Sequence, residues 1–375
     1  MMKLSTRHKP LWLAFALGML AIFLCSPDGR AQGVKDLPPA PPPWRAKPTP
    51  TPKPAEPEVV DVIKTTSNLV MVPVSVTDTT NGAAVQGLQA TDFRLEEEGK
   101  QRDIAEIGNP EQIPLDIAIL FDISSSVSQK GFFQFQQKSA AAFLKDVMKP
   151  SDKAAVFTIA MEPKMVQALA PAETAAARIL SIPAATSSVP TAFYDTVMAA
   201  ARYLNDNSPA RHRRVIVVLS DGDDNFSERI RDLSLAEVKA TEGAPRAALV
   251  GLQDDRHRKA ITEVQQTVLK SDVTFYSVNP GGRSVALNVS ATRAQNGMNT
   301  VANASGGSAF LPDNDQDLEK VFRQVASELR GQYLLMYYAD ADAPVGQFRR
   351  INVTVPARQL IKVRARQGYY SKKQP

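Results

Sequence analysis

Three oxygen-bearing side chains, Asp122, Ser124 and Ser126, follow one apolar run and are spaced two residues apart. Residues 115–121 before them read Leu-Asp-Ile-Ala-Ile-Leu-Phe, which predicts a buried strand. Residues 127–148 after them predict a helix. The three side chains should therefore lie on a loop at the carboxyl end of a strand, where open α/β sheets bind ligands. Carboxylate and hydroxyl oxygens suit a hard cation such as Mg²⁺, Mn²⁺ or Ca²⁺.

An Asp-x-Ser-x-Ser sequence by itself has a simpler interpretation, a solvated loop whose Asp or Ser caps the next helix. Two later stretches favour a site. The apolar run 215–219 predicts a second buried strand, and Asp221 follows it within Ser-Asp-Gly-Asp. Between the two strands, Thr191 opens the helical stretch 191–204. Three loops therefore carry carboxylate or hydroxyl groups that would meet at one edge of a sheet.

This ordered set of residues resembles the metal-ion-dependent adhesion site of the von Willebrand factor A family. The family pattern is Asp-x-Ser-x-Ser after the first strand, a Thr before a central helix, and Asp-Gly after the fourth strand. Residues 191–195, Thr-Ala-Phe-Tyr-Asp, are similar to the family's Thr-Ala-Leu-Tyr-Asp, although Val189 and Pro190 stand where Gly is common. The resemblance covers residues 113–331, and residues 151–157 look like the start of the family's second strand.

The resemblance implies a site for a divalent cation, with Mg²⁺ preferred and Mn²⁺ or Ca²⁺ as alternatives. Its implied ligands are Asp122, Ser124, Ser126, Thr191 and Asp221. The Ser and Thr hydroxyls would contact the ion, and the two carboxylates would act partly through water. Because only a few carboxylates would bind the ion directly, its positive charge would be incompletely balanced. A partner's carboxylate would balance it and complete the octahedral coordination that Mg²⁺ prefers. The expected partner is a protein ligand with an exposed Asp or Glu.

The sequence lacks the motifs of common enzymes. It contains no His-Glu-x-x-His, no Gly-x-Ser-x-Gly and no phosphate-binding Gly-x-x-x-x-Gly-Lys. Outside the first 31 residues there are two histidines, His212 and His257, and no cysteine, since Cys25 is the only one. We therefore expect a non-catalytic binding module. A scaffold or assembly factor of an envelope complex is the alternative, and a metal-free structural domain is a third interpretation.

The first 31 residues look like an export signal, with basic residues before the apolar run 11–24. That run is too short for a comfortable membrane-spanning helix, and a cleavage site is expected at Ala31. Two alternatives stay open: a retained signal anchor, and a lipoprotein at Cys25, although Phe-Leu before this cysteine fits a lipobox poorly. The predicted location is therefore outside the cytoplasm: periplasmic, cell-surface or secreted. The layout, with β segments before and after the α/β domain, also resembles bacterial secreted proteins of this family, which implies a bacterial source.

The net charge of +5 comes mostly from this signal segment, which holds four of the 44 basic and one of the 39 acidic residues. Without it the net charge falls to +2, which gives no case for binding nucleic acid or a membrane surface. Membrane contact is expected only through an uncleaved signal anchor. The basic cluster 211–214, Arg-His-Arg-Arg, is interpreted as a solvated turn before a buried strand.

Composition divides the chain into five predicted parts. They are a signal peptide at 1–31, a Pro-rich linker at 32–57, an N-terminal β segment at 58–112, the α/β domain at 113–331 and a C-terminal β segment at 332–375. The linker should act as a polyproline spacer. Each β segment is too small for a core of its own, so we expect the two to form one β-sandwich with the α/β domain inserted between them.

Strands and helices alternate within the α/β domain, which predicts a doubly wound, mostly parallel, Rossmann-like sheet. Its clearest helix spans 317–330, with a buried stripe that includes Leu318, Phe322 and Val325. Residues 281–299 are rich in Asn and Ser, which favours a long surface loop available for partner contact. The predicted fold class is thus an α/β domain with a smaller β-sandwich-like domain built from the two flanks.

Overall fold

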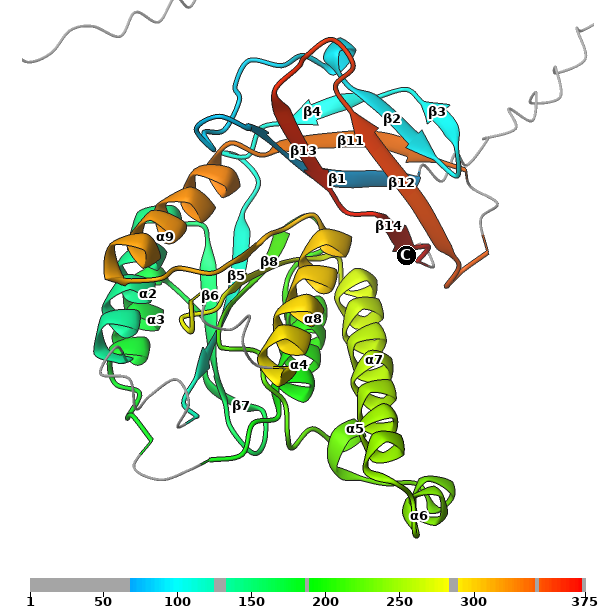
Figure 1. Cartoon of the computed structure of the whole chain (residues 1–375). Helices are drawn as coiled ribbons and strands as arrows, with labels where there is room; N and C mark the ends of the chain where they lie inside the picture. Colours follow the sequence, from blue (N-terminus) through cyan, green and yellow to red (C-terminus); the bar gives the residue numbers. More distant parts are fainter. Residues whose placement is uncertain (1–67, 125–132, 186–188, 283–288, 341–343, 373–375) are drawn as a thin grey trace, which may run out of the picture. The chain divides into compact units, whose positions relative to one another are not determined.

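The structure of the 375-residue chain is a computed structural model, in which residues 68–124, 133–185, 189–282, 289–340 and 344–372 are described (Figure 1). The predicted signal peptide, the Pro-rich linker and Ser126 lie outside these residues. No helix in the described part of the chain is long and apolar enough to cross a membrane.

A six-stranded sheet with the strand order β10-β9-β8-β5-β6-β7 forms the centre of the α/β domain. Its strands are β5 (Leu115–Asp122), β6 (Lys153–Ile159), β7 (Lys164–Ala170), β8 (Arg213–Leu219), β9 (Val273–Val278) and β10 (Ala309–Phe310). Neighbouring strands are parallel except β6 and β7, which are antiparallel. Every residue of β5, β8 and β9 is buried, as expected for parallel strands covered on both faces.

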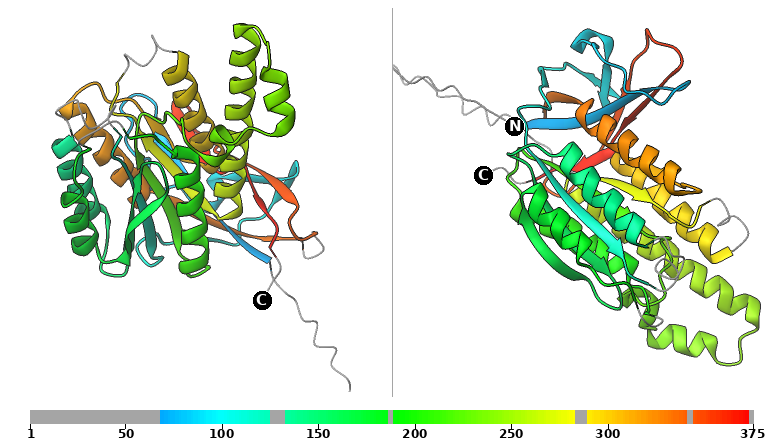
Figure 2. Two further views of the ribbon diagram at one scale, coloured as in Figure 1. Left: turned by 90° about the horizontal axis from the view of Figure 1, so that it is seen from below. Right: turned by 90° about the vertical axis from the view of Figure 1, so that its left-hand side faces the viewer.

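Helices cover both faces of this sheet (Figures 1 and 2). They are α2 (Phe133–Val147), α3 (Ala172–Leu180), α4 (Phe193–Asn207), α5 (Glu228–Arg231), α6 (Leu235–Thr241), α7 (Arg246–Lys270), α8 (Val289–Ser305) and α9 (Asp315–Arg330). Ile117, Ile119 and Phe121 of β5 pack with α2, α3 and α9. Ala118 and Leu120 point to the other face, toward α4, α7 and α8. The alternation of side chains along one strand therefore builds two cores.

Helix α8 contradicts the surface loop predicted for 281–299. Residues 283–288 lie outside the described residues, but a helix begins at Val289. Ala294, Met298 and Val301 are buried at helical spacing and pack against the sheet. Asn296 and Asn303 are exposed on the other side of the helix. The low helix propensity of the Asn and Ser residues concealed this short apolar stripe.

The strands outside the α/β domain form two antiparallel four-stranded sheets, with orders β13-β1-β11-β4 and β14-β12-β2-β3. The strands before the α/β domain are β1 (Asn68–Asp78), β2 (Arg94–Glu97), β3 (Lys100–Arg102) and β4 (Glu106–Gly108). The strands after it are β11 (Tyr333–Ala339), β12 (Phe348–Thr354), β13 (Ile361–Ala365) and β14 (Gly368–Tyr370). A short 3₁₀ helix, η1 (Ala90–Asp92), precedes β2.

Each of these two sheets mixes strands from both flanks of the chain. β1 pairs with β11 and β13, and β2 pairs with β12. Val72 and Val74 of β1 lie in one apolar cluster with Leu335, Tyr337 and Ile351. This arrangement, together with the mostly parallel central sheet, confirms the predicted fold class. The predicted domain boundaries stay predictions.

The predicted solvated turn at 211–214 is wrong for its two last arginines. Arg213 and Arg214 begin β8 and are only 4% and 6% exposed. Arg213 donates a hydrogen bond to the Leu329 carbonyl (2.6 Å), and Arg214 donates one to the Ser271 carbonyl (3.1 Å). Both guanidinium groups are buried because backbone carbonyls from neighbouring elements accept their protons.

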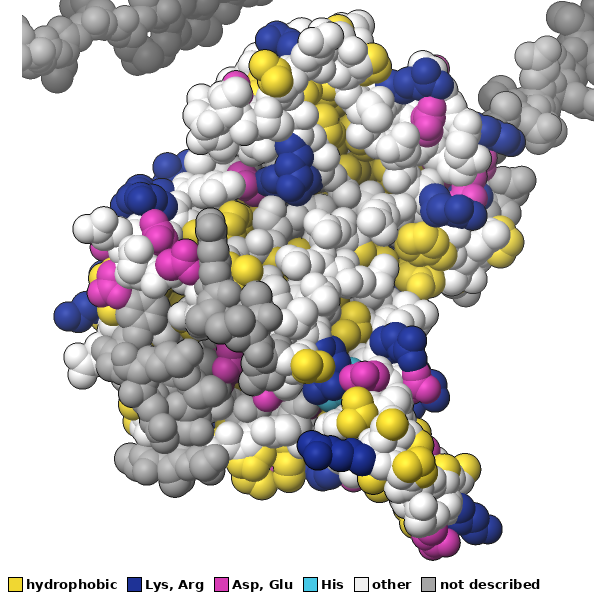
Figure 3. All heavy atoms as spheres, viewed as in Figure 1, with side chains coloured by type: hydrophobic (Ala, Val, Ile, Leu, Met, Phe, Trp, Pro, Cys, Tyr) yellow, Lys and Arg dark blue, Asp and Glu magenta, His cyan; other side chains and the backbone are white. Residues whose placement is uncertain are grey.

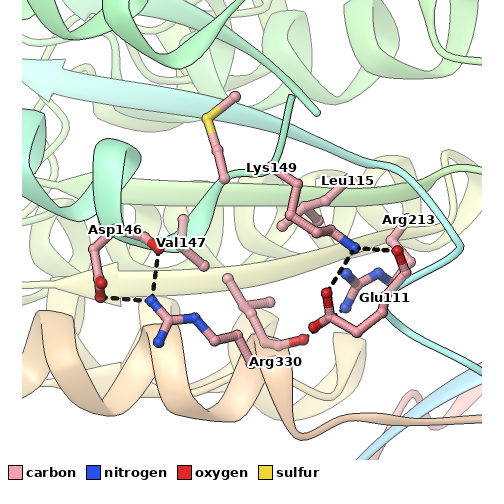
Figure 4. Close-up of a pocket in the computed structure, with 9 residues that line it drawn as sticks. Glu111, Leu115, Asp146, Val147, Lys149, Arg213 and Arg330 are labelled. Carbon is pink, nitrogen blue, oxygen red and sulfur yellow. Dashed lines mark hydrogen bonds and ion pairs between the residues drawn. The ribbon is translucent and has the colours of Figure 1, made fainter. Parts of the chain in front are cut away.

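A small pocket lies at this amino-terminal edge of the sheet (Figure 4). Leu115, which begins β5, lines it, so the pocket is at the opposite edge from Asp122. Lys149 in the pocket donates to the carbonyls of residues 110 and 111, both at 2.8 Å. Arg330 pairs with Asp146 at 2.8 Å. These two cations are thus already partnered within the protein.

Helix α6 and the first turns of α7 protrude from the α/β domain (Figures 1 and 2). Their exposed apolar side chains include Leu235, Val238, Leu249 and Val250, and hydrophobic atoms gather on this protrusion in Figure 3. Arg256 of α7 donates to the carbonyls of residues 230 and 232 and thereby fixes α5 to α7. The protrusion thus has a hydrogen-bonded base and an apolar tip.

Candidate metal site

Three adjacent strands position the loops that carry the predicted site residues. Asp122 ends β5, and Asp221 follows β8. β5 pairs with β8 on one side and with β6 on the other. Thr191 precedes α4, and the amide of the next residue, Ala192, donates to the carbonyl of Ala160 just after β6 (2.8 Å). The loops therefore lie at the same carboxyl edge of the sheet, as the sequence predicts.

Asp122 is fully buried, and both of its carboxylate oxygens accept hydrogen bonds. Oδ1 accepts from the Ser124 amide at 2.7 Å, and Oδ2 accepts from the Ser220 hydroxyl at 2.6 Å. Burial, together with the negative charge of Asp221, raises the pKa of Asp122 to about 7. Two neighbouring carboxylates at a buried edge repel each other, and a bound cation would relieve that repulsion.

The hydroxyl-bearing residues of the set are largely shielded from solvent. Ser124 is 3% exposed and Thr191 is 5% exposed, whereas Ser126 lies outside the described residues. Within the described part of the chain, no group of three or more His, Cys, Asp or Glu side chains is placed to hold a metal ion. A cation at this edge would therefore depend on hydroxyl oxygens as well as on carboxylates. That donor set fits a hard cation.

The turn that carries Asp221 depends on Gly222, the glycine of the predicted Asp-Gly pattern, and on Ser220, which sequence reasoning did not single out. The Ser220 hydroxyl donates to Asp122 and also accepts from the Gly222 amide at 2.9 Å, so it links the β5 and β8 loops. Gly222 has a φ of +74°, and a Cβ there would lie 2.7 Å from the Met298 Cε atom. The sequence signal for Ser220 is a polar residue at the end of an apolar strand.

Asp224 supports the helix that follows Thr191. It is 3% exposed, and its Oδ2 atom accepts from the amide of Tyr194 at the start of α4 (2.7 Å). The hydroxyl and amide of Ser227 also donate to this carboxylate (2.5 and 3.0 Å). Burial raises the pKa of Asp224 to about 6. This carboxylate is fully occupied within the protein and holds the start of α4 in place.

The fold and this edge define a doubly wound α/β domain that presents carboxylates and hydroxyls from three loops. The family model of the von Willebrand factor type A domain matches residues 116–324. The chain belongs to this family, and the resemblance in its sequence is confirmed. A comparison with curated proteins gave no match.

Solved structures with a similar fold come from several sources. Proximal thread matrix protein 1 from the mussel byssus is 15% identical over 61% of this chain and 49% of its own, with a TM-score of 0.40. A second structure of that protein has its MIDAS motif occupied by zinc. The PilB minor pilin from Streptococcus sanguinis is 14% identical over 59% of this chain and 62% of its own (TM-score 0.42). The vWF domain of the pilus tip protein Mfa5 from Porphyromonas gingivalis is 12% identical over 57% of this chain and 95% of its own (TM-score 0.41).

The chain therefore spans about half of the mussel protein and less than two thirds of the pilin. At these identities and TM-scores the structural likenesses add no argument to the family assignment, which rests on the family model.

Proposed function

We propose that this protein is an adhesion-type binding module that captures a carboxylate of a protein partner through a divalent cation, with Mg²⁺ as the preferred ion. Domains of its family are typically non-catalytic interaction modules, which supports a binding role. The observation that carries the proposal is the placement of the loops bearing Asp122, Thr191 and Asp221 at one carboxyl edge of the sheet.

The residues at this edge have distinct parts in the proposal. The hydroxyls of Ser124, Ser126 and Thr191 would contact the cation. Asp122 already accepts two hydrogen bonds within the protein, so it would act mainly through coordinated water, as would Asp221. The cation would supply an electrophilic position that a partner's Asp or Glu completes.

Export is part of the proposal. The basic and then apolar residues at the start of the sequence support a signal peptide, and the Pro-rich stretch supports a spacer between an anchoring point and the folded domains. We place the protein in the periplasm, at the cell surface or in the secreted fraction.

One observation favours the alternative of a non-catalytic scaffold or assembly factor. The tip of the α6–α7 protrusion exposes Leu235 (83%) and Val250 (49%), and contacts with such a surface would need no cation. The two functions therefore differ in whether chelation of divalent ions abolishes partner binding.

Calorimetry with Mg²⁺ on wild type and on Asp122→Ala/Asp221→Ala tests the metal site. We expect one site in the wild type and none in the double variant, because both carboxylates are lost. The variant should stay folded, since Asp122 ends β5, Asp221 follows β8, and both lie outside the two apolar cores. Immobilised wild type should retain partner proteins from an envelope extract, and EDTA should abolish that retention. The immobilised double variant should retain none.

Thr191→Ala is a milder second test, because it removes one hydroxyl and leaves both carboxylates. It should weaken cation-dependent capture and keep the circular dichroism spectrum of the wild type. Equal Mg²⁺ binding by the wild type and the double variant would contradict the metal site. Partner capture that persists in excess EDTA would support the scaffold alternative.

A further inference from the structure

Both backbone polar groups of Thr191 are hydrogen-bonded to the loop that follows β8. The Thr191 amide donates to the side-chain oxygen Oδ1 of Asn225 at 2.8 Å. The Thr191 carbonyl accepts from the amides of Asn225 (3.0 Å) and Phe226 (3.1 Å). Thr191 is 5% exposed, so its amide depends on a protein acceptor.

Further bonds join the same two segments. Asp224 accepts from the Tyr194 amide, as described above. The Asp195 amide donates to the Ser227 hydroxyl (3.1 Å), and the Asp195 carboxylate accepts from the amide of Glu228 (2.8 Å). Residues 224–228 of the loop that begins with Asp221 are thus fastened to the start of α4. Thr191 and Asp221 therefore lie on two segments that are joined by hydrogen bonds. These segments are distant in the sequence: Tyr194 and Asp224, which share one of the bonds, are 30 residues apart.

We propose that Asn225 is a positioning residue of the metal site: its side-chain oxygen fixes Thr191 relative to Asp221 and thereby sets the affinity for the divalent cation. The inference rests on the proposed function. It assigns to Asn225 no contact with the ion. Partners that orient metal ligands typically change metal affinity 10–100-fold when they are removed.

The surroundings of Asn225 make this role separable from folding. Asn225 is exposed, so loss of its amide group leaves no cavity. The bonds made by Asp224, Asp195 and the Asn225 backbone do not involve that amide group and would still hold the loop against α4. What is lost is the single side-chain acceptor of the Thr191 amide.

Calorimetry with Mn²⁺ on the full chain compares the wild type with Asn225→Ala, Asn225→Asp and Asn207→Ala. We expect affinity roughly tenfold weaker for Asn225→Ala. Asn225→Asp keeps an acceptor for the Thr191 amide and should bind Mn²⁺ at least as tightly as the wild type. Asn207→Ala removes an exposed asparagine side chain at the far end of α4 and should bind like the wild type.

Two measurements without metal separate positioning from a structural role. The melting temperature of Asn225→Ala should stay within about 3 °C of the wild type. Hydrogen exchange of the Thr191 amide should become faster in Asn225→Ala and stay slow in Asn225→Asp. Wild-type affinity in Asn225→Ala overturns the inference and leaves the proposed function standing. Equal losses of affinity in the Ala and Asp variants also overturn it. A wild type that binds no cation overturns the proposed function and this inference together.

Discussion

The Ser220 hydroxyl shows how one small side chain joins two loops of the candidate site. It donates to the carboxylate of Asp122 and accepts from the amide of Gly222, and it is fully buried. A hydroxyl can do both because it has one proton and two lone pairs. The carboxylate at the end of β5 and the turn after β8 are therefore held in register by a residue that belongs to neither predicted motif.

Gly222→Ala tests the backbone of this turn. Gly222 has a left-handed φ of +74° and its added Cβ would meet Met298. We expect the free energy of unfolding to fall by about 2 kcal/mol or more, from the left-handed conformation and the close contact together. Gly243→Ala is the matched control, because Gly243 has a φ of +67° with nothing within 4 Å, so it should lose only about 1 kcal/mol. Equal losses in urea titrations of the two variants would contradict a role for Met298.

The main residues of the candidate site could be predicted from the sequence because each stands at a recognisable end of an element. Asp122 and Asp221 follow apolar runs, and Thr191 precedes a helical stretch. Ser220 and Asn225 could not be predicted in the same way. Their roles depend on hydrogen bonds between loops that are far apart in the sequence. The local pattern marks Ser220 only as a polar residue after an apolar strand, and it does not distinguish Asn225 from a solvated loop residue.

Helices α4 and α7 are joined by a buried pair of polar rings. The Nδ1 atom of His257 lies 2.9 Å from the Tyr194 hydroxyl, and His257 is 1% exposed. Burial lowers the pKa of His257 to about 4. Arg293 and Arg256 act in the same direction, whereas Asp223 and Asp254 oppose it. The imidazole is therefore neutral in the folded protein above a pH of about 4.

The pKa of His257 predicts how stability changes with pH. Between pH 6.5 and 4 the unfolded state binds a proton that the folded state does not, so this residue makes the free energy of unfolding fall as the pH falls. His257→Gln removes that contribution. For each protein, urea titrations give the free energy of unfolding at each pH, from which its value at pH 8 is subtracted. We expect this difference to grow less in the variant than in the wild type as the pH falls from 6.5 to 4. Parallel curves for the two proteins would contradict the prediction.

Two features of the fold could not be predicted from the local sequence pattern. The stripe of α8 is short and lies among Asn and Ser residues, which read as loop. Arg213 and Arg214 read as solvated because isolated charges avoid the interior, yet carbonyls of distant segments accept their protons. The long apolar strands and α9 could be predicted, since periodicity within a single segment was sufficient to identify them.

At the scale of the whole molecule, ion pairs join the β-sandwich to the α/β domain, and one of them is buried. Arg364 of β13 lies 2.5 Å from Glu328 of α9, and both side chains are at most 9% exposed. Arg366, which follows β13, pairs with Asp272 before β9 at 2.6 Å. Removing one partner of the Arg364–Glu328 pair leaves a buried charge uncompensated, so this pair links the stability of one domain to the placement of the other.

Truncation after residue 331 tests the shared sandwich. It removes β11 to β14 and with them the pairing partners of β1 and β2. We expect limited proteolysis to cut the segment 68–108 rapidly, while 113–331 stays protected by its own two cores. Truncation after residue 372, which keeps all the strands, is the control and should leave the wild-type pattern. Protection of 68–108 in the shorter protein would show that the first flank folds without the second.

The order in which the chain is synthesised gives the sandwich a particular difficulty. Its first strands are made early, but their partners emerge much later; Leu88 and Tyr333, which share a hydrogen bond, are 245 residues apart in the chain. Closing so long a loop is slow while the intervening chain is unfolded. Gly108 and Leu334, just outside the two ends of the α/β domain, are direct neighbours in a sheet. A folded α/β domain therefore brings the two flanks together in advance, and a substitution that delays its folding would leave β1 to β4 unpaired and open to aggregation on a newly made chain.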